Sequence, residues 1–364
     1  MIIDRYLIKE VLMTFLGVVF ILLMIALSGQ LASLFSKVVD GTLTVDTVLT
    51  MFGLKLIVTL AQVLPLSFFL GILLAFSRLY NDSEMVVLTA CGMGQFRVLR
   101  SILGLAIVIA LLEGAVTLVI APWAEVHTQQ IYAEVAAQSD VDAIIPGRFK
   151  EIDDGGIIYI EGENQEKTLM DNLFVQQNTD GKKAIISAAS GRQYIDADTG
   201  DKFVVLNNGS RYEGKPGQLN FAIIKFKEYG VRIKEKDVAP IRYKHYSSPT
   251  LELYRSKNIG DKAELQSRIS SILLCIVLAL IAVPLSRTSP RQGRYAKLAI
   301  ALLLYITYTN LLNVARAWII KGDISTQMGL WWVHAIMIII SLLMLFQQTG
   351  FKHYFQKQPN RSHA

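Results

Sequence analysis

The residues of this 364-residue chain that could perform chemistry are few and widely spaced. The histidines lie at positions 127, 245, 334, 353 and 363, so no close pair is suited to a metal ion. The glycine-rich stretch CGMGQFR follows no predicted strand and lacks the Gly-Lys-Ser/Thr end of a phosphate loop. Ser67 and Ser286 lack the G-x-S-x-G context of an activated nucleophile. We therefore expect no catalytic residue, no metal site and no cofactor in this chain.

Glu113, in ALLEGAVTLVI, is the one carboxylate well inside a predicted apolar span. A charged group is costly in hydrocarbon, so such a residue is a functional candidate by default. The alternative is that Glu113 lies in a wet cavity, or pairs with a neighbour to hold helices together. The sequence leaves both interpretations open. His334, in WWVHAIM, is more typical of a membrane interface than of a metal ligand.

The elements that must position these residues are mostly membrane helices. The chain is 52% hydrophobic, with a mean hydropathy of +0.40, which is too apolar for a soluble protein of this length. Six apolar segments are long enough to cross about 30 Å of hydrocarbon. These segments are 11–34, 52–76, 98–121, 269–286, 297–317 and 330–346. No small-residue cleavage site follows the first segment, so we expect a retained span and not a signal peptide.

The predicted spans carry two prolines and one of the two cysteines. Pro65 and Pro284 are expected to kink or end their helices. Cys91 lies between spans and Cys275 inside one, so a stabilising disulfide is not expected.

Lysine and arginine in the short loops predict the orientation, because these residues collect on the cytoplasmic side. One set of loops carries only Lys37, Arg316 and Lys321. The other side carries Arg5, Lys9, Arg78, Arg97, Arg100, Arg287, Arg291, Arg294, Lys297, Lys352, Lys357 and Arg361. Both termini are therefore predicted to be cytoplasmic, and residues 122–268 extracytoplasmic. The formal charge of +6 belongs to the membrane-associated parts, and no compact basic face suggests a nucleic-acid partner.

The long middle segment changes to strand-like patterns. These are GIIYIEG, NLFVQQN, KAIISAAS, KFVVLNN and LNFAIIKFKEYGVRI, with turn signals between them. Several short strands of this kind predict an antiparallel sandwich or open barrel. Alternation places Phe203 with Val205, and Phe221 with Ile223, on like faces of their strands.

The stretch RLYNDSEMVVLTACGM at 78–93 predicts a short helix over 82–91 between two spans. Asp82 or Ser83 could cap its N-terminus, and Gly92 could close its C-terminus. A helix this short is not stable alone in water, so it must dock on a surface. The residues themselves do not decide whether that surface belongs to this chain or to a partner.

Several stretches resemble the lipopolysaccharide-export permease family, LptF/LptG, from end to end. These are MII-RYL-KE, LPLSFFLGILLAFSRLYNDSEM followed by ACGM, PGRF, LNNGSRYEG and VPLSRTSPRQGR. PRQGR and LYNDSEM favour the LptF-type subunit. The resemblance implies six transmembrane helices with an inserted all-β, jellyroll-like periplasmic domain, in a multi-pass protein of a Gram-negative inner membrane. The implied parts are 1–125, 126–265 and 266–364.

The resemblance also implies a function without catalysis in this chain. A permease subunit of an ABC transporter would extract lipopolysaccharide from the inner membrane and pass it to a periplasmic jellyroll bridge toward the outer membrane. The implied partners are an LptG-type paralogous permease, an LptB-type ATPase dimer that uses ATP and Mg²⁺, and an LptC-type single-span protein. Two alternatives stay open: a subunit exporting another amphipath such as a lipoprotein, and an intramembrane enzyme.

The family further implies roles for residues of this sequence. The helix 82–91 becomes a coupling helix, with its ATPase contacts from Glu84, Met85, Val86 and Leu88. Lipid contacts are expected from Lys37, Arg316, Lys321, Phe221 and Ile223. Family members often carry basic residues at the end of the first span, where this chain has Gln30 and Ser33. The basic candidates could bind phosphate, or could simply anchor their helices at the interface.

Overall fold

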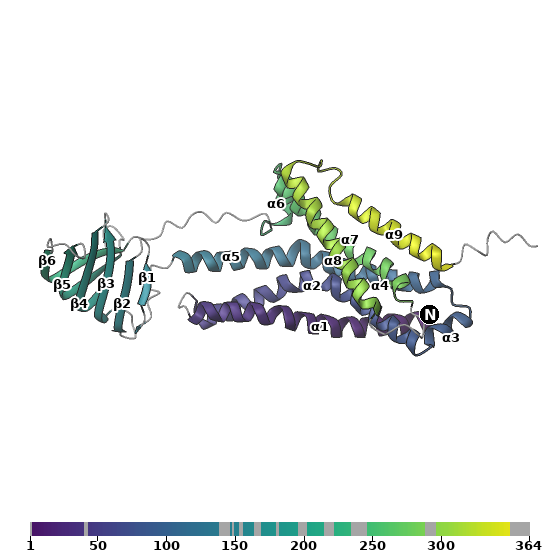
Figure 1. The fold of residues 1–364 in the computed structure, drawn as a ribbon, viewed down its shortest axis with the longest axis horizontal. Helices are drawn as coiled ribbons and strands as arrows, with labels where there is room; N and C mark the ends of the chain where they lie inside the picture. Colours follow the sequence, from purple (N-terminus) through teal and green to yellow (C-terminus); the bar gives the residue numbers. More distant parts are fainter. Residues whose placement is uncertain are drawn as a thin grey trace, which may run out of the picture. The chain divides into compact units, whose positions relative to one another are not determined.

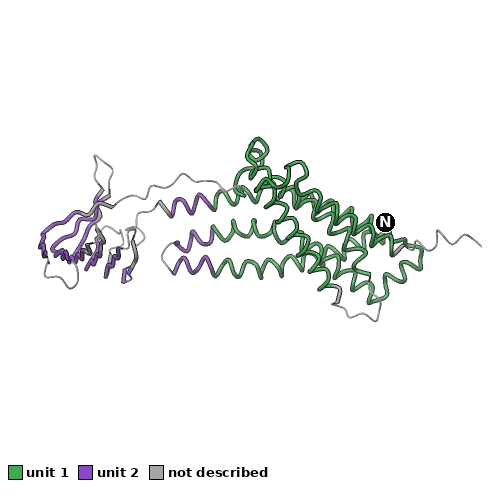
Figure 2. The backbone as a smooth tube through the Cα atoms, turned by 45° about the horizontal axis from the view of Figure 1, so that its top comes forward, with its two compact units in different colours: residues 1–32, 51–128, 243–364 green, residues 33–50, 129–242 purple. Residues whose placement is uncertain are grey.

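A computed structural model describes residues 2–39, 43–137, 146–147, 149–152, 156–163, 169–179, 182–195, 202–214, 222–233, 246–287 and 296–349. The chain divides into two compact units (Figure 2). Unit 1 holds residues 1–32, 51–128 and 243–364, and it is helical. Unit 2 holds residues 33–50 and 129–242, and it contains the β-sheet.

Helices make up most of the described chain (Figure 1). They are α1 (Ile2–Val39), α2 (Val45–Asn81), α3 (Glu84–Ala90), α4 (Gln95–Ala115), the π-helix η1 (Val116–Ile120), α5 (Ala121–Ala137), α6 (Thr250–Arg255), α7 (Ile259–Leu285), α8 (Ala296–Lys321) and α9 (Trp331–Thr349). Five helical stretches are long and apolar enough to cross a membrane: α1, α2, α4 continued through η1 and α5, α7 and α8. The apolar part of α9, Trp331–Gln347, is shorter, so the sixth span stays a prediction.

Several helices are longer than the apolar patterns predicted. The 38 residues of α1 extend over about 57 Å at 1.5 Å per residue, well beyond the roughly 30 Å of hydrocarbon. Helix α7 begins at Ile259, ten residues before the expected span at 269. Its start is fixed by Asn258, whose side chain accepts a hydrogen bond from the Gly260 amide at 2.8 Å. Hydropathy alone does not detect such extensions, because the part of a helix that lies outside the hydrocarbon does not need to be apolar.

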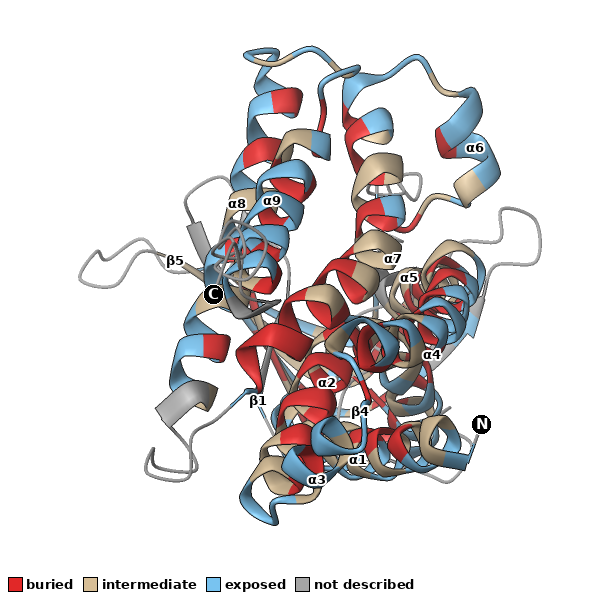
Figure 3. Cartoon of the chain, turned by 90° about the vertical axis from the view of Figure 1, so that its right-hand side faces the viewer, coloured by how far each residue is buried: buried red, intermediate tan, exposed pale blue. Residues whose placement is uncertain are grey.

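The core of unit 1 surrounds α7, which packs against α4, α8 and α9 and is buried along much of its length (Figure 3). Helices α1 and α2 contribute Phe15 and Phe68, whose rings meet edge to face at 5.6 Å between centroids. Gly71 of α2 faces the backbone of Phe15, and a Cβ at Gly71 would lie 2.8 Å from the Phe15 Cα. The missing side chain therefore permits the close approach typical of helices packed in a membrane.

Unit 2 contains one six-stranded antiparallel sheet in which consecutive strands are neighbours. The strands are β1 (Phe149–Ile152), β2 (Gly156–Glu163), β3 (Leu169–Thr179), β4 (Lys182–Ile195), β5 (Lys202–Gly214) and β6 (Ala222–Ile233). The predicted antiparallel β domain is thus confirmed. The sequence left a sandwich and an open barrel as alternatives, and within the described residues the sandwich is not present, because each strand pairs with the next to form a single curved meander (Figure 2).

A row of irregular positions crosses this sheet. In each of the four ladders between β2 and β6, one facing pair is not bonded as a ladder pair, although the register on either side of it is the same. The residues concerned are Glu161, Asn172, Ala189, Asn208 and Lys227, one from each strand. Asn172 and Asn208 have φ angles of 46° and 51°, in the left-handed region that asparagine tolerates. At this row the alternation of buried and exposed side chains shifts by one residue.

The structure confirms that Phe203 and Val205 share one face of β5. That face is the less buried one, and Val204 and Leu206 on the other face form the core. Beyond the row, simple alternation with a period of two no longer identifies the inner face.

Strand β6 shows the same effect. Ile223 lies opposite Tyr212, which in turn lies opposite Ile185, and all three are exposed on the outer face. Ile224 lies opposite Arg211, which pairs with the fully buried Ile186 on the inner face. Ile223, an expected lipid contact, therefore lies on the outer face of β6, and Ile224 lies on the inner face. Phe221 lies outside the described residues.

Candidate functional site

Unit 1 encloses a cavity of about 800 Å³ among its membrane helices. Its wall comes from α2, α4, η1, α5, α7 and α8, together with Tyr246 and Leu330. Charged and polar side chains line it: Lys55, Gln62, Glu113, Thr117, Glu125, Glu264, Ser267, Arg268, Ser270, Ser271, Thr309, Asn313 and Arg316. Polar groups at this density are costly beside hydrocarbon and mark a candidate functional site.

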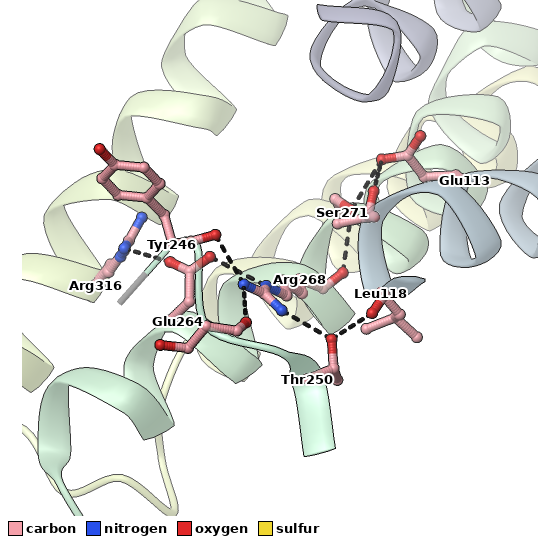
Figure 4. Close-up of polar contacts among 10 residues, drawn as sticks. Glu113, Leu118, Tyr246, Thr250, Glu264, Arg268, Ser271 and Arg316 are labelled. Atoms are coloured by element: carbon pink, nitrogen blue, oxygen red, sulfur yellow. Dashed lines mark hydrogen bonds and ion pairs between the residues drawn. The ribbon is translucent and has the colours of Figure 1, made fainter. Parts of the chain in front are cut away.

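Two arginines of the cavity share one carboxylate (Figure 4). Glu264 and Arg268 lie one turn apart on α7, and the Arg268 Nε donates to the Glu264 Oε1 at 3.2 Å. Arg316 of α8 donates from Nη2 to the other oxygen, Oε2, at 2.5 Å. Glu264 and Arg268 are buried, whereas the Arg316 side chain is 32% exposed. Because two guanidinium groups share one carboxylate, the cluster carries net positive charge.

Arg268 also holds the segment 246–250, where the chain returns to unit 1 (Figure 4). Its Nη2 donates to the carbonyl oxygens of Tyr246 and Ser248 at 2.9 and 3.0 Å. Its Nη1 donates to the Thr250 Oγ1 at 2.8 Å. The buried guanidinium therefore donates to three acceptors of this segment.

Thr250 links this segment to the π-helix. Its hydroxyl donates to the carbonyl of Leu118 within η1. Pro122, four residues after Leu118, has no N–H to offer that carbonyl, so an α-helical bond is impossible there. The proline and the threonine together explain why the helix widens at η1 without leaving this carbonyl unsatisfied.

Glu113 lies fully buried in the wall of the cavity. Its Oε1 accepts hydrogen bonds from Thr117 on its own helix at 2.8 Å and from Ser271 of α7 at 3.0 Å. Its Oε2 has no hydrogen-bond partner among the described residues. Glu113 thus joins α4 to α7 and also borders a polar cavity. Both structural roles that the sequence left open, a place in a cavity and a link between helices, therefore apply to it.

The remaining cavity charges form a second pair. Lys55 of α2 donates to Glu125 of α5 at 3.4 Å, with both side chains partly buried. Lys55 is therefore neutralised, and the positive charge open to a ligand lies at Arg316. A guanidinium presents planar paired donors that match a phosphate or carboxylate. The cavity can accordingly hold an anionic group beside apolar helices.

The three basic residues that the sequence named as lipid contacts have different surroundings in the structure. Only Arg316 lines the cavity. Lys37, near the end of α1, donates to the hydroxyl of Tyr132 at 2.9 Å and lies 4.4 Å from the centre of its ring. Lys321 is exposed in the last turn of α8. Of the three basic candidates, Arg316 is thus the one that lies in the wall of a polar cavity.

The short helix α3 ends as predicted but begins differently. Gly92, with φ of 84°, lets its own amide and that of Met93 bond back to Thr89 and Leu88, which is a complete Schellman motif. Ser83 has φ of 62° and makes no side-chain capping bond, so the predicted polar N-cap is wrong. Asp82 instead lies 3.9 Å from Arg78, one turn earlier.

Helix α3 has one face on its own bundle and one face free. Met85 is 2% exposed and belongs to the core of unit 1, so it offers no surface to a partner in this structure. Leu88 packs partly against the same core. Val86 and its unpredicted neighbour Val87 are 55% and 59% exposed. Glu84 accepts a hydrogen bond from the Tyr6 hydroxyl of α1 at 2.6 Å.

His334, near the start of α9, is buried among neighbouring helices. One ring nitrogen, Nε2, lies 2.5 Å from the Ser270 hydroxyl, and Nδ1 lies 2.5 Å from the Tyr308 hydroxyl. The three residues connect α7, α8 and α9 through hydrogen bonds. No group of three metal-ligating side chains occurs within the described part of the chain. Cys91 is exposed and Cys275 is buried, both as free thiols.

A comparison with known families now bears on this arrangement. The family model "Lipopolysaccharide export system permease LptF/LptG" matches residues 5–347. The chain belongs to the LptF/LptG family. Similar curated proteins are the lipopolysaccharide export system permease protein LptF of Escherichia coli strain K12 and its counterpart in Shigella flexneri. Each is 29% identical over 353 residues, which cover 96% of this chain and 96% of the relative.

For this LptF/LptG-family chain, the sequence missed the centre of the cavity. Glu264 and Arg268 fell within residues 122–268, which were predicted to be extracytoplasmic, because the apolar run begins at 269. Their spacing of four residues at a span boundary was the available signal, since it places both on one helix face. The role of Lys55 could not be predicted either, because its carboxylate partner Glu125 lies 70 residues away in the sequence.

Proposed function

We propose that this chain is the LptF-type subunit of a lipopolysaccharide exporter. It would take lipopolysaccharide from an inner membrane and deliver it toward the outer membrane, while a separate ATPase supplies the energy. The match of the family model over residues 5–347 is the observation that carries this proposal. The structure supports it with apolar helices, a charged cavity among them and a separate β-sheet.

The cavity is proposed to receive the phosphorylated headgroup of the lipid. Arg316 would pair with a phosphate, because its side chain is the most exposed of the three bases in the wall and it shares its carboxylate, Glu264, with Arg268. Lys321, one turn and a half later on the exposed end of α8, would act as an interfacial anchor. Lys37 would contribute to phosphate binding only after leaving Tyr132.

Helix α3 is proposed to couple the permease to an LptB-type ATPase dimer, the site of ATP and Mg²⁺ binding. Val86 and Val87 provide an exposed apolar face on a helix whose other side is held by Met85. Such a helix suits a groove, with apolar anchors for affinity and a charge for register. Glu84 would supply that charge, and its bond to Tyr6 would orient it.

The sheet of unit 2 is proposed to carry acyl chains onward, next to an LptC-type partner. Exposing acyl chains to water would cost about 0.8 kcal/mol per CH₂, so a conduit must offer an apolar face. Ile224 and Phe226 lie on the inner face of β6, which is one of the two edge strands of the described sheet. An edge strand can also pair with a strand of a partner, such as an LptG-type or LptC-type β domain.

The orientation belongs to the same proposal. The chain would be a multi-pass inner-membrane protein with both termini in the cytoplasm and the sheet in the periplasm. This places α3, which precedes α4 by a few residues, on the cytoplasmic side, where an ATPase could reach it. The charge bias of the short loops supports this orientation.

Affinity purification of the full-length chain from a native Gram-negative membrane, in mild detergent, tests the proposal. We expect an ATPase, a paralogous permease and a single-span protein to co-purify, and lipopolysaccharide to dominate the extracted lipid. Recovery with an ATPase but with lipoprotein as the bound amphipath would overturn the assigned cargo. Recovery without any ATPase would overturn the exporter itself.

A further inference from the structure

The pair Glu264–Arg268 joins two places that a transporter must coordinate. Arg316 borders the cavity, and segment 246–250 connects the β-sheet to the membrane helices. Glu264 contacts Arg316 on one side and Arg268 on the other, and Arg268 holds the segment (Figure 4).

Arg268 has too few N–H groups to bind the whole segment and both oxygens of Glu264 at the same time. An arginine has five N–H groups in a fixed plane. Both N–H groups of Nη2 are used by the carbonyl oxygens of Tyr246 and Ser248. One N–H of Nη1 serves Thr250, and Nε serves Glu264. A carboxylate that pairs side-on with arginine needs both Nε and Nη2, so Arg268 cannot satisfy the segment and a bidentate Glu264 together.

Arg316 holds Glu264 in the single-bonded arrangement. The Arg316–Glu264 contact is 2.5 Å, shorter than the 3.2 Å of the Arg268–Glu264 contact. While Arg316 occupies Oε2, only Oε1 is available to Arg268. An anionic group that paired with Arg316 would compete for this guanidinium, because phosphate accepts the same paired donors as a carboxylate. Glu264 would then be left with Arg268 as its remaining partner in a buried site, where an unpaired charge is costly.

We propose that Glu264 and Arg268 are positioning residues that convert anion binding at Arg316 into release of segment 246–250. When a lipid-borne phosphate pairs with Arg316, Glu264 closes side-on onto Arg268. One N–H of Arg268 Nη2 then turns to Glu264 and gives up its carbonyl oxygen, that of Tyr246 or Ser248. Binding in the cavity thereby loosens the segment that leads to the sheet. This inference rests on the proposed function, because it takes the anion to be the phosphate of the transported lipid.

The test measures the accessibility of the segment in the complete complex reconstituted in nanodiscs. The chain carries Ser248→Cys, which leaves the backbone carbonyl in place, in a Cys91→Ser background; Cys275 is buried. The observable is the rate of modification by a water-soluble maleimide. Bisphosphorylated lipid A should raise that rate about tenfold, the equilibrium change expected for the loss of one hydrogen bond to a charged group. Fully dephosphorylated lipid A should leave the rate unchanged.

Two variants of one ion pair should move the rate in opposite directions. Arg316→Gln removes the partner that holds Glu264, so position 248 should react fast with or without lipid A. Glu264→Gln cannot form the ionic side-on pair, so position 248 should react slowly under both conditions. Arg316→Lys keeps the charge and should retain part of the response to lipid A. A merely structural role would make all the variants that weaken the cluster react faster.

The outcomes separate this inference from the function on which it rests. Lipid A that co-purifies with the complex but does not change the rate at position 248 would overturn the coupling and leave the function standing. Lipid A that fails to bind the complex at all would count against the function. Equal acceleration by inorganic phosphate would overturn the assignment of a lipid-borne anion. An Arg316→Gln variant that reacts as slowly as the parent would contradict the proposed competition directly.

Discussion

At the scale of single residues, one face of α3 contributes to stability and the opposite face is available to a partner. Met85 fills the core of unit 1, and Val87 is exposed on the opposite side. Met85→Ala should lower the thermal unfolding midpoint, because a buried methionine truncated to alanine typically costs about 2–5 kcal/mol. Val87→Ala should leave that midpoint unchanged while less ATPase is retained on affinity resin. An unchanged midpoint for Met85→Ala would contradict the packing of α3.

The hydrogen bonds around His334 give a second prediction at this scale. His334→Phe leaves the hydroxyls of Ser270 and Tyr308 buried without their partner, which costs about 1–3 kcal/mol for each group. Tyr308→Phe removes one of those hydroxyls. The double variant should therefore be less destabilised than the sum of the single variants, as a double-mutant cycle on thermal stability would measure. Additive losses would mean that the two residues do not interact.

Residue identities were predictable where chemistry is local and were missed where it depends on distant partners. Gly92 was assigned correctly, because a helix end needs a left-handed residue whatever lies around it. Arg316 was assigned by its type and position. Glu264, Arg268 and Lys55 were missed, because their importance comes from contacts that only the packed bundle creates.

At the scale of elements, the row of irregular positions in the sheet decides which residues meet the lipid. A photo-crosslinking residue at position 224 should capture lipopolysaccharide during ATP-driven transport, because this position shares the inner face with buried Ile186. The matched residue at position 223 should not, because it lies on the outer face with Tyr212. Capture at 223 and not at 224 would show that the lipid uses the opposite face.

Helix α3 gives the second prediction at this scale. Glu84→Arg should weaken ATPase association and ATP turnover, because it reverses the charge that we assign to the partner's groove and breaks the bond to Tyr6. Asp46→Arg is the matched control, an equal charge reversal in the exposed first turn of α2, at the other end of a spanning helix. The experiment compares co-purified ATPase at equal expression. Equal loss in both variants, or in neither, would argue against α3 as the coupling element.

Elements were predictable from the sequence to the extent that one physical force defines them. Hydropathy located the apolar helices, because burial in hydrocarbon requires about twenty apolar residues in each. It placed the start of α7 too late, because a capped polar extension has no such requirement. The strands β2 to β6 were found by their turns and apolar runs, whereas the four-residue β1 was not. Their inner faces were not, because Asn172 and Asn208 shift the alternation in the middle of the strands.

At the scale of the whole molecule, the orientation can be tested with a native thiol. Cys91 is exposed beside α3, whereas Cys275 is buried and contributes no background. In cells with a permeabilised outer membrane, a membrane-impermeant maleimide should label Asn208→Cys but not Cys91. Cys91 should react once the inner membrane is disrupted. Reaction of Cys91 from the periplasmic side would reverse the orientation.

The transport of lipopolysaccharide itself tests the account most directly. The purified complex, containing this chain and its co-purified partners, is reconstituted with lipopolysaccharide in proteoliposomes, and transfer to a soluble periplasmic acceptor domain is followed. We predict transfer with ATP and Mg²⁺, none with a non-hydrolysable analogue, and a marked decrease for Arg316→Gln but not for Lys321→Gln. Transfer that is absent with ATP, or that proceeds equally without hydrolysis, would contradict the account.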